Sequence, residues 1–240
     1  MDKKYALVTG ANGGIGVEVC KMLLEQDYFL YVNVRSESSA IELISKLKQI
    51  GGECKALIFD IRDKKEIIKE IACIKKIDIL INNAGILKDN LIYNTTLQDW
   101  FDVVDTNFYA VDSFYENIKK FLVKNSTIIS LCSISGIHPR SGQVSYGTSK
   151  SMLIQWSKSM AKLEPEKNFY AISPGPVDTT LIKNTPWYKD EQYLSQIPLA
   201  RYAKPEEIAN FIRYIISDIS LFKSGENIVL DGGLINKAVR

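Results

Sequence analysis

The sequence predicts an α/β fold built on a parallel sheet, and two observations carry that prediction. Short apolar segments that resemble strands alternate with amphipathic helical segments along most of the 240 residues. A helix that follows each strand returns the chain to the same side of the sheet, so that successive strands run parallel. The first strand-like segment, 5–8, also runs directly into a glycine-rich turn and then into a helical pattern.

Composition indicates one large domain that spans residues 1–240. No Pro/Gly/Ser-rich linker, charge block or repeat divides the chain, and 46% of its residues are hydrophobic, enough for a full core. The 30 basic and 28 acidic residues leave a net charge of only +2. This balance gives no reason to expect nucleic acid or an acidic membrane surface as a partner.

Neither a metal site nor a disulfide is expected. The four cysteines (Cys20, Cys54, Cys73 and Cys132) are widely spaced, and the sequence has no CxxC pair and only one histidine, His138. The N-terminus lacks the apolar stretch of a signal peptide, and no apolar run approaches the ~20 residues that span a bilayer. We therefore expect a cytoplasmic protein.

The turn after the first strand carries the earliest functional signal. Glycines stand at 10, 14 and 16, and Val17, Cys20, Leu23 and Leu24 then recur at helical spacing. Glycines in this context allow a tight turn and a close approach of backbone amides to a phosphate, and the helix N-terminus favours negative charge. The spacing predicts a dinucleotide site, although an ordinary glycine turn is the alternative.

The end of the second strand, 29–34, suggests which dinucleotide would bind. An acid at this place binds the adenosine ribose hydroxyls, whereas a basic residue suits a 2′-phosphate. Here Arg35 and Ser36 follow the strand, and the nearest acid is Glu37. Because a guanidinium matches a phosphate with paired hydrogen bonds, we favour NADP(H) over NAD(H). The alternative is that Arg35 merely begins a solvated helix.

Further polar residues follow the next predicted strands. Segment 56–59 runs into Asp60, and segment 77–81 runs into the sequence Asn82-Asn83-Ala84-Gly85, with amphipathic helical patterns between the strands. Ligands of parallel sheets collect at the carboxyl ends of the strands. We therefore expect both places to contribute to the site.

A long helical pattern covers 97–122, with Asn107 in its middle. Asn is a poor residue for a helix interior, so a structural purpose or a local kink is expected, with an exposed and harmless Asn as the alternative. The next predicted strand, 127–132, places Ser133 at its carboxyl end.

A tyrosine and a lysine follow at helical spacing. Tyr146 and Lys150 lie four residues apart, and Met152, Leu153, Trp156, Met160 and Leu163 continue an apolar helical pattern. The two side chains therefore lie on one helix face. A nearby ammonium favours the phenolate, so we expect Lys150 to lower the pKa of Tyr146 from about 10. Taken alone, a surface Tyr–Lys pair would be the simpler interpretation.

Together these motifs resemble the short-chain dehydrogenase/reductase family over nearly the whole chain. The matching features are Thr9-Gly10-x3-Gly14-x-Gly16, Asn82-Asn83-Ala84-Gly85, Asn107, Ser133, Tyr146-x3-Lys150 and Pro174-Gly175. The resemblance implies a single Rossmann-type doubly wound domain, with a seven-stranded parallel sheet and helices on both faces. It also implies assembly into a homodimer or homotetramer, with the last strand, 228–230, at the sheet edge and in the subunit contact.

The resemblance assigns roles residue by residue. Tyr146 is expected as the general acid or base, Lys150 as the group that lowers its pKa, Ser133 as the partner of the substrate oxygen, and Asn107 as the holder of a relay water. Expected cofactor contacts are Gly10, Asn12, Gly14, Ile15, Gly16, Arg35, Ser36, Asp60, Ile61, Asn83, Ala84, Gly85, Tyr146, Lys150, Pro174, Gly175, Val177 and Thr179.

Within the family, the stretch Leu87-Lys88-Asp89-Asn90-Leu91 with Trp100, and the stretch from Gly136 to Tyr146, look most like 3-oxoacyl-acyl-carrier-protein reductases. This implies a 3-oxoacyl thioester substrate and an acyl carrier protein as a partner. Departures at 137–140 and 163–169 leave open a sugar, a polyol or another small ketone. A non-catalytic dinucleotide-binding regulator is the alternative of another class.

The substrate side is predicted from the same resemblance. Segment 178–196 corresponds to a mobile lid, and its aromatic residues are expected either to line an apolar pocket or to pack a short helix. We expect Ser135, Gln143 and Trp187 to contact the substrate. His138 is interpreted as a loop residue without a chemical role.

Overall fold

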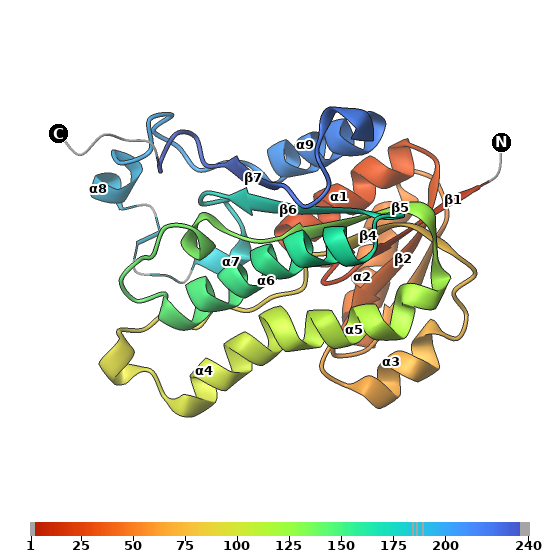
Figure 1. Ribbon diagram of the computed structural model, residues 1–240, viewed down its shortest axis with the longest axis horizontal. Helices are drawn as coiled ribbons and strands as arrows, with labels where there is room; N and C mark the ends of the chain where they lie inside the picture. Colours follow the sequence, from red (N-terminus) through yellow and green to blue (C-terminus); the bar gives the residue numbers. More distant parts are fainter. Residues whose placement is uncertain (1–2, 184, 186, 189, 236–240) are drawn as a thin grey trace.

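A parallel sheet forms the centre of the molecule (Figure 1). The computed structural model describes every residue except 1–2, 184, 186, 189 and 236–240. In the described part, seven strands lie in the order β3-β2-β1-β4-β5-β6-β7, and all neighbours pair in parallel. The strands are β1 (Lys4–Val8), β2 (Tyr28–Val34), β3 (Cys54–Ile58), β4 (Ile77–Asn82), β5 (Leu122–Leu131), β6 (Asn168–Pro174) and β7 (Asn227–Leu230).

The strand order changes direction at β1. The chain first builds outward from β1 through β2 to β3, then returns to the other side of β1 and continues from β4 to β7. Ala6 in β1 accordingly pairs with Leu30 of β2 on one side and Ile79 of β4 on the other. A crevice for ligands forms at such a switch point, beyond the carboxyl ends of the strands.

Helices cover both faces of the sheet (Figure 1). One core contains residues of α1 (Gly14–Glu25), α2 (Glu37–Lys48) and α9 (Pro205–Ser217), and the other contains residues of α3 (Lys64–Ile71), α5 (Ala110–Ile118) and α6 (Val144–Leu163). Successive strand residues alternate between them, so that Leu7 is buried in the second core and Val8 in the first. The predicted fold class is confirmed.

Short elements complete the chain. Three of them are the helices α4 (Leu97–Val104), α7 (Thr180–Lys183) and α8 (Glu191–Leu194). The others are a π-helical segment, η2 (Asp105–Tyr109), and four short 3₁₀ segments, η1 (Ile92–Asn94), η3 (Lys119–Phe121), η4 (Ile134–Gly136) and η5 (Ile219–Leu221). Among the described residues, no helix has the length and apolar character needed to cross a membrane. The same residues contain no cluster of His, Cys, Asp or Glu that could hold a metal ion.

The expected helical pattern at 97–122 is interrupted in its middle and ends slightly earlier than predicted. The π-helical segment η2 separates α4 from α5, the helix ends at Ile118, and Leu122 already belongs to β5. That strand begins earlier than the predicted residue 127 because Leu122 pairs with Ile77, beyond an irregularity in the ladder. Asn125 within this stretch has a φ of 63°, in the left-handed region where Asn is enriched among non-glycine residues. Cys132 lies just outside the strand.

Candidate active site

The glycine turn lies at the carboxyl end of β1 and is packed too closely for side chains. Gly10 has a φ of +58°, and a Cβ built on it would lie 2.8 Å from Cα of Ala84. A Cβ on Gly16 would lie 2.6 Å from the carbonyl oxygen of Gly10. Gly13, at the N-cap of α1, brings no side chain to the helix end. The first amides of α1 are therefore free of a side-chain cap, as a phosphate group requires.

Three polar side chains hold this turn against its neighbours. Asn83 Nδ2 donates to the carbonyl oxygens of Thr9 (3.0 Å) and Gly10 (2.8 Å), and Thr9 Oγ1 accepts from the backbone N–H groups of Asn83 and Ala84. From the other side, Asn33 Oδ1 accepts from the N–H of Gly10 (3.3 Å). Thr9 and Asn33 were not predicted as site residues. A fully buried polar residue in an apolar strand is the signal that could have found Asn33.

A cavity of about 670 Å³ opens beside the turn. Most predicted cofactor residues line it, namely Gly10, Asn12, Gly14, Ile15, Arg35, Asp60, Ile61, Asn83, Ala84, Gly85 and Thr179. Two others do not. Gly16 packs under the turn, and Ser36 caps α2 by accepting a hydrogen bond from the N–H of Ser39. A cavity of this size, with glycine backbone and a helix N-terminus in its wall, fits the phosphate chain of a dinucleotide.

Two arginines stand at one end of this cavity. Arg62 donates two hydrogen bonds to the Asp60 carboxylate, from Nε (3.0 Å) and from Nη2 (2.9 Å). This contact holds the pKa of the Asp60 carboxyl below its usual range. Arg35 also lines the cavity and forms no salt bridge with any described residue. Arg62 was not predicted, because its partner Asp60 stands only two residues away and the pair reads as a local surface contact. The free guanidinium of Arg35 is the one available to an anion.

The three expected catalytic side chains converge beyond the other end of the cavity. Ser133 begins η4 at the end of β5, and Tyr146 and Lys150 lie on the first turns of α6. Ser133 and Tyr146 both line the smaller cavity described below, and the Ser133 side chain lies close enough to lower the pKa of Tyr146 slightly. Lys150 Nζ lies 5.7 Å from the centre of the Tyr146 ring and donates to the carbonyl oxygen of Leu131 (2.7 Å).

Burial controls the protonation of this pair. It raises the pKa of Tyr146, against a smaller opposing effect of the Ser133 side chain, and it lowers the pKa of Lys150. The expectation that Lys150 lowers the pKa of Tyr146 is therefore wrong for this structure. The ammonium faces the backbone of β5, and the loss of solvent around the phenol dominates.

Asn107 occupies the π-helical segment and is fully buried, so the exposed alternative is excluded. Its side chain accepts from the N–H of Ile86 (2.8 Å) and donates to the carbonyl oxygen of Ile86 (3.0 Å) and to Ser149 Oγ (3.1 Å). A Cβ on Gly85 would lie 3.2 Å from Asn107 Oδ1 and 3.5 Å from Lys150 Nζ. The wider turn of a π-helix brings Asn107 against the loop after β4.

A smaller cavity, of about 80 Å³, lies over Ser133 and Tyr146. Four residues line both cavities, namely Ile15, Leu87, Thr179 and Leu181. The two spaces therefore meet at these four residues, and Ser133 and Tyr146 belong to the smaller space alone. The predicted residues Pro174, Gly175 and Val177 lie in the wall of the smaller cavity, whereas Asn107 and Lys150 lie behind both walls.

The three residues expected to contact the substrate, Ser135, Gln143 and Trp187, all line the smaller cavity. Arg140 lines it as well and was not predicted as a substrate residue. Tyr193 of the expected lid is buried, while His138 is exposed.

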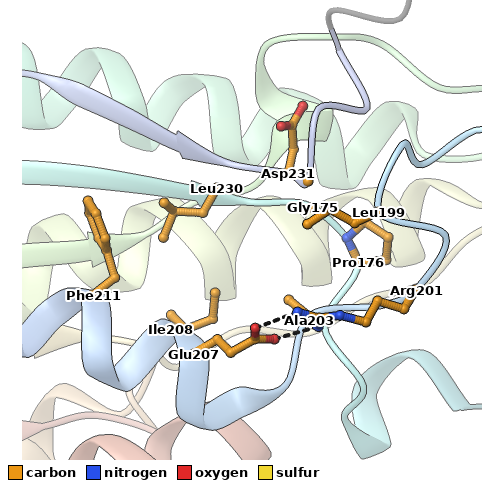
Figure 2. A pocket seen from close by; sticks show the side chains of 11 residues that line it. Gly175, Pro176, Leu199, Arg201, Ala203, Glu207, Ile208, Phe211, Leu230 and Asp231 are labelled. Carbon is orange, nitrogen blue, oxygen red and sulfur yellow. Dashed lines mark hydrogen bonds and ion pairs between the residues drawn. The ribbon is translucent and has the colours of Figure 1, made fainter.

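A third cavity, of about 230 Å³, lies beside Gly175 and Pro176, which directly follow β6 (Figure 2). Phe211 and Ile208 of α9 and Leu230 of β7 form its apolar side, and Arg201 and Glu207 pair across its rim (Figure 2). Gly175 and Pro176 line both this cavity and the small one over Tyr146. The two spaces are thus separated by a single stretch of backbone.

Comparison with known proteins agrees with this arrangement. A family model described as short chain dehydrogenase matches residues 4–189. The chain belongs to this family. It is 30% identical over 243 residues to the 3-oxoacyl-(acyl-carrier-protein) reductase FabG of Thermotoga maritima, with 98% of this chain and 99% of that protein covered. It is 33% identical over 242 residues to the protein of the same name from Buchnera aphidicola, with 98% of each covered.

Solved structures place this short chain dehydrogenase in the same fold. A short-chain dehydrogenase/reductase from Serratia marcescens superposes with a TM-score of 0.87 at 26% identity, over 96% of this chain and 97% of that one. An actinorhodin polyketide ketoreductase with NADPH gives a TM-score of 0.90 at 23% identity, over 98% of both chains, a likeness of fold. The protein is an oxidoreductase of the short-chain dehydrogenase/reductase family.

Proposed function

We propose that this dehydrogenase is an NADP(H)-dependent reductase that acts on the ketone of a 3-oxoacyl thioester. The observation that carries the proposal is that Ser133 and Tyr146 both line the smaller cavity, which shares part of its wall with the larger cavity beside the glycine turn. A ketone in the smaller cavity would have its oxygen at these hydroxyls and its carbon towards the larger cavity. The bound nicotinamide would supply the hydride.

Tyr146 is assigned as the general acid. The ordinary pKa of a phenol is about 10 and burial raises it here, so Tyr146 holds its proton at neutral pH. This is the proton that it can give to the substrate oxygen. Ser133 would hold the same oxygen and stabilise the charge that develops on it. Lys150 and Asn107 lie behind Tyr146, beside Gly85, and are assigned to the return of a proton to the phenol.

The preference for NADP(H) rests on the adenosine end of the large cavity. Arg35 forms no salt bridge with any described residue there, and Arg62 keeps the neighbouring Asp60 occupied. A 2′-phosphate would give Arg35 a bidentate partner, whereas an unmodified ribose would leave its charge unused.

The choice of a thioester rests on similarity and on the small cavity. The relatives from Thermotoga maritima and Buchnera aphidicola are named as 3-oxoacyl-(acyl-carrier-protein) reductases. The cavity combines the catalytic hydroxyls with apolar groups of Leu87, Ile134 and Ile182, a lining that suits an acyl chain better than a sugar. Docking of an acyl carrier protein belongs to the same proposal.

We further propose that the protein forms homo-oligomers. Tyr93, Leu97, Phe101 and Tyr109 are all more than half exposed around α4 and η2. β7 forms one edge of the sheet, and its Val229 is 40% exposed. Apolar surface gathered in this way is typical of contacts between protein chains.

A substrate panel tests the proposed reaction. The purified protein is mixed with NADPH or NADH and with an acetoacetyl thioester, a sugar, a polyol or a simple ketone, and the oxidation state of the nicotinamide is followed by absorbance. We expect fastest turnover with NADPH and the thioester. Turnover of another carbonyl compound or alcohol, with none of the thioester, would refute the substrate assignment.

A further inference from the structure

A carboxylate lies beneath the cover of the small cavity and has no part in the chemistry assigned above. Asp89 belongs to the loop that follows β4, and its side chain is half-buried. Oδ2 accepts two hydrogen bonds, from Gln143 Nε2 (2.8 Å) and from Trp187 Nε1 (3.3 Å). Oδ1 is buried and accepts no hydrogen bond from any described residue. A charged group in such a place needs a reason, since its burial is costly.

On one side, Asp89 connects to the catalytic hydroxyls through a chain of hydrogen bonds. Gln143, which Asp89 holds by its amide nitrogen, accepts from Ser135 Oγ through Oε1 (2.7 Å). The N–H of Ser135 in turn donates to Ser133 Oγ (3.1 Å). Gln143 and Ser135 are both buried and line the cavity. The orientation of the Gln143 amide, and with it the Ser135 hydroxyl, is thus set by Asp89.

On the other side, Asp89 reaches the aromatic cover. The Trp187 ring lies 4.9 Å from the guanidinium of Arg140, which lies 4.4 Å from the ring of Tyr193 and donates to its hydroxyl (2.8 Å). Trp187 and Tyr193 pack edge to face with centres 5.3 Å apart. Arg140 contacts the face of the Trp187 indole, whereas the indole N–H donates to Asp89. The direction of the N–H is therefore set by Asp89.

The two donors require one oxygen that accepts twice. Gln143 and Trp187 both present N–H groups to the same carboxylate oxygen. An ionised carboxylate accepts both, and hydrogen bonds to a charged acceptor are stronger than neutral ones. An Asn at this place could accept both hydrogen bonds through its single oxygen, but without the charge that strengthens them.

We propose that Asp89 is a positioning residue that joins the floor of the substrate pocket, through Gln143, to its cover, through Trp187. The inference rests on the proposed function, because it gives the cavity over Tyr146 to the substrate. Asp89 itself lies outside the lining of that cavity, so it acts through the two residues that it holds.

Asp89→Asn tests the proposal in kinetics. We expect the KM for the carbonyl substrate to rise about tenfold with a smaller fall in kcat, as for a lost hydrogen bond to a charged group, while the KM for NADPH stays unchanged. Asp112→Asn is the matched control, because Asp112 Oδ1 accepts from Trp156 Nε1 (2.8 Å) in the second core, away from the pocket. It should lower thermal stability and leave both KM values unchanged.

Fluorine NMR of protein labelled with 5-fluorotryptophan gives a second readout that needs no turnover. The Trp187 resonance, assigned by its loss in Trp187→Phe, should move in Asp89→Asn and become more sensitive to the exchange of H₂O for D₂O. The Trp156 resonance should move only in Asp112→Asn. Should Asp89→Asn fail to fold, Trp187→Phe, which removes one donor and keeps a ring, should raise the KM for the substrate in the same direction.

The outcomes separate this inference from the proposed function. An unmoved Trp187 resonance in Asp89→Asn overturns the inference whatever the kinetics show, and so does an unchanged KM for the substrate. If the wild-type protein reduces no carbonyl compound, the proposed function fails. The resonance still decides whether Asp89 holds Trp187.

Discussion

At the scale of residues, the chemistry of this protein depends on which ionisable side chains are buried. The phenol of Tyr146 is made a weaker acid by burial, and the ammonium of Lys150 a stronger one. Each group is thereby pushed towards its neutral form. A neutral phenol beside Ser133 carries the proton that a reduced ketone oxygen needs. Arg35 remains charged at the far end of the large cavity.

Tyr146→Phe should abolish turnover and retain cofactor binding. The substitution removes the hydroxyl that donates the proton and keeps the ring, so we expect kcat to fall by at least about a hundredfold. Rate measurements and a fluorescence titration with NADPH check the two parts. Substantial activity in this variant would refute the assigned acid.

Arg35→Asp should turn cofactor preference towards NADH. A carboxylate repels the 2′-phosphate and can accept hydrogen bonds from ribose hydroxyls, so the ratio of kcat/KM for NADPH to that for NADH should fall by about ten- to a hundredfold. Lys48→Asp, the same charge change at an exposed site on α2, is the control. An unchanged ratio in Arg35→Asp would mean that another group, with Arg62 the nearest candidate, reads the phosphate.

At the scale of elements, helix ends and irregularities place the functional groups. The π-helical turn at Asp105–Tyr109 directs Asn107 towards the loop after β4. The start of α9 is fixed differently. Glu207 accepts from the N–H of Lys204 (2.7 Å) and pairs with both terminal nitrogens of Arg201 at the rim of the third cavity. Residues 201–207 thereby close one side of that cavity.

Glu207→Gln should lower stability in a pH-dependent way. Arg201 and the Lys204 N–H lower the pKa of Glu207 from 4.5 to about 2 in the folded protein. A depressed carboxyl pKa stabilises the fold above about 4.5, and this contribution is lost as the pH falls towards about 2. We expect a Tm lower by about 2 °C at neutral pH, as for a weakened helix cap in a chain of this size.

The difference in Tm should shrink as the pH falls below about 4.5. Glu206→Gln is the matched control. Glu206 precedes Glu207 in the first turn of α9, and its side chain is exposed and forms no ion pair with any described residue. A Tm difference that stays constant across this pH range would assign the effect to packing instead of charge.

At the scale of the whole molecule, the sheet order creates the site. Because the chain crosses from β3 back to β4 beside β1, the glycine turn and the Asn82–Gly85 loop meet at one crevice. The next strands, β5 and β6, bring Ser133 and Pro174 alongside it. The same order leaves β3 and β7 at the two edges, and the surface of α4 carries apolar side chains on the outside.

Self-association should depend on the exposed face of α4. Phe101 is 61% exposed there, and Phe101→Glu should lower the molar mass measured by light scattering at micromolar concentration, because a charge cannot be buried in an apolar contact without cost. Ile41→Glu is the control, since Ile41 is 72% exposed on α2. A wild-type protein that remains monomeric would refute the proposed assembly.

Much of the fold and of the candidate site could be predicted from local patterns. Three features depend only on residues that are close in the sequence: strand β1, the glycine turn that follows it and the apolar face of α6. The spacing of those residues is therefore enough to predict them. Local patterns failed where distant contacts decide. Leu122 of β5 pairs with Ile77 of the neighbouring strand β4, and no pattern within ten residues of Leu122 predicts that pairing.

The sequence by itself therefore determined the fold class, the family and the set of chemical groups, because periodicity and short motifs are properties of neighbouring residues. Only the tertiary structure decided how those groups are used. It turned the Lys150 ammonium towards Leu131, tied Asp60 to Arg62, and joined Asp89 to Gln143 and Trp187. The physical reason is that burial and hydrogen-bond partners are set by segments that meet only when the chain has folded.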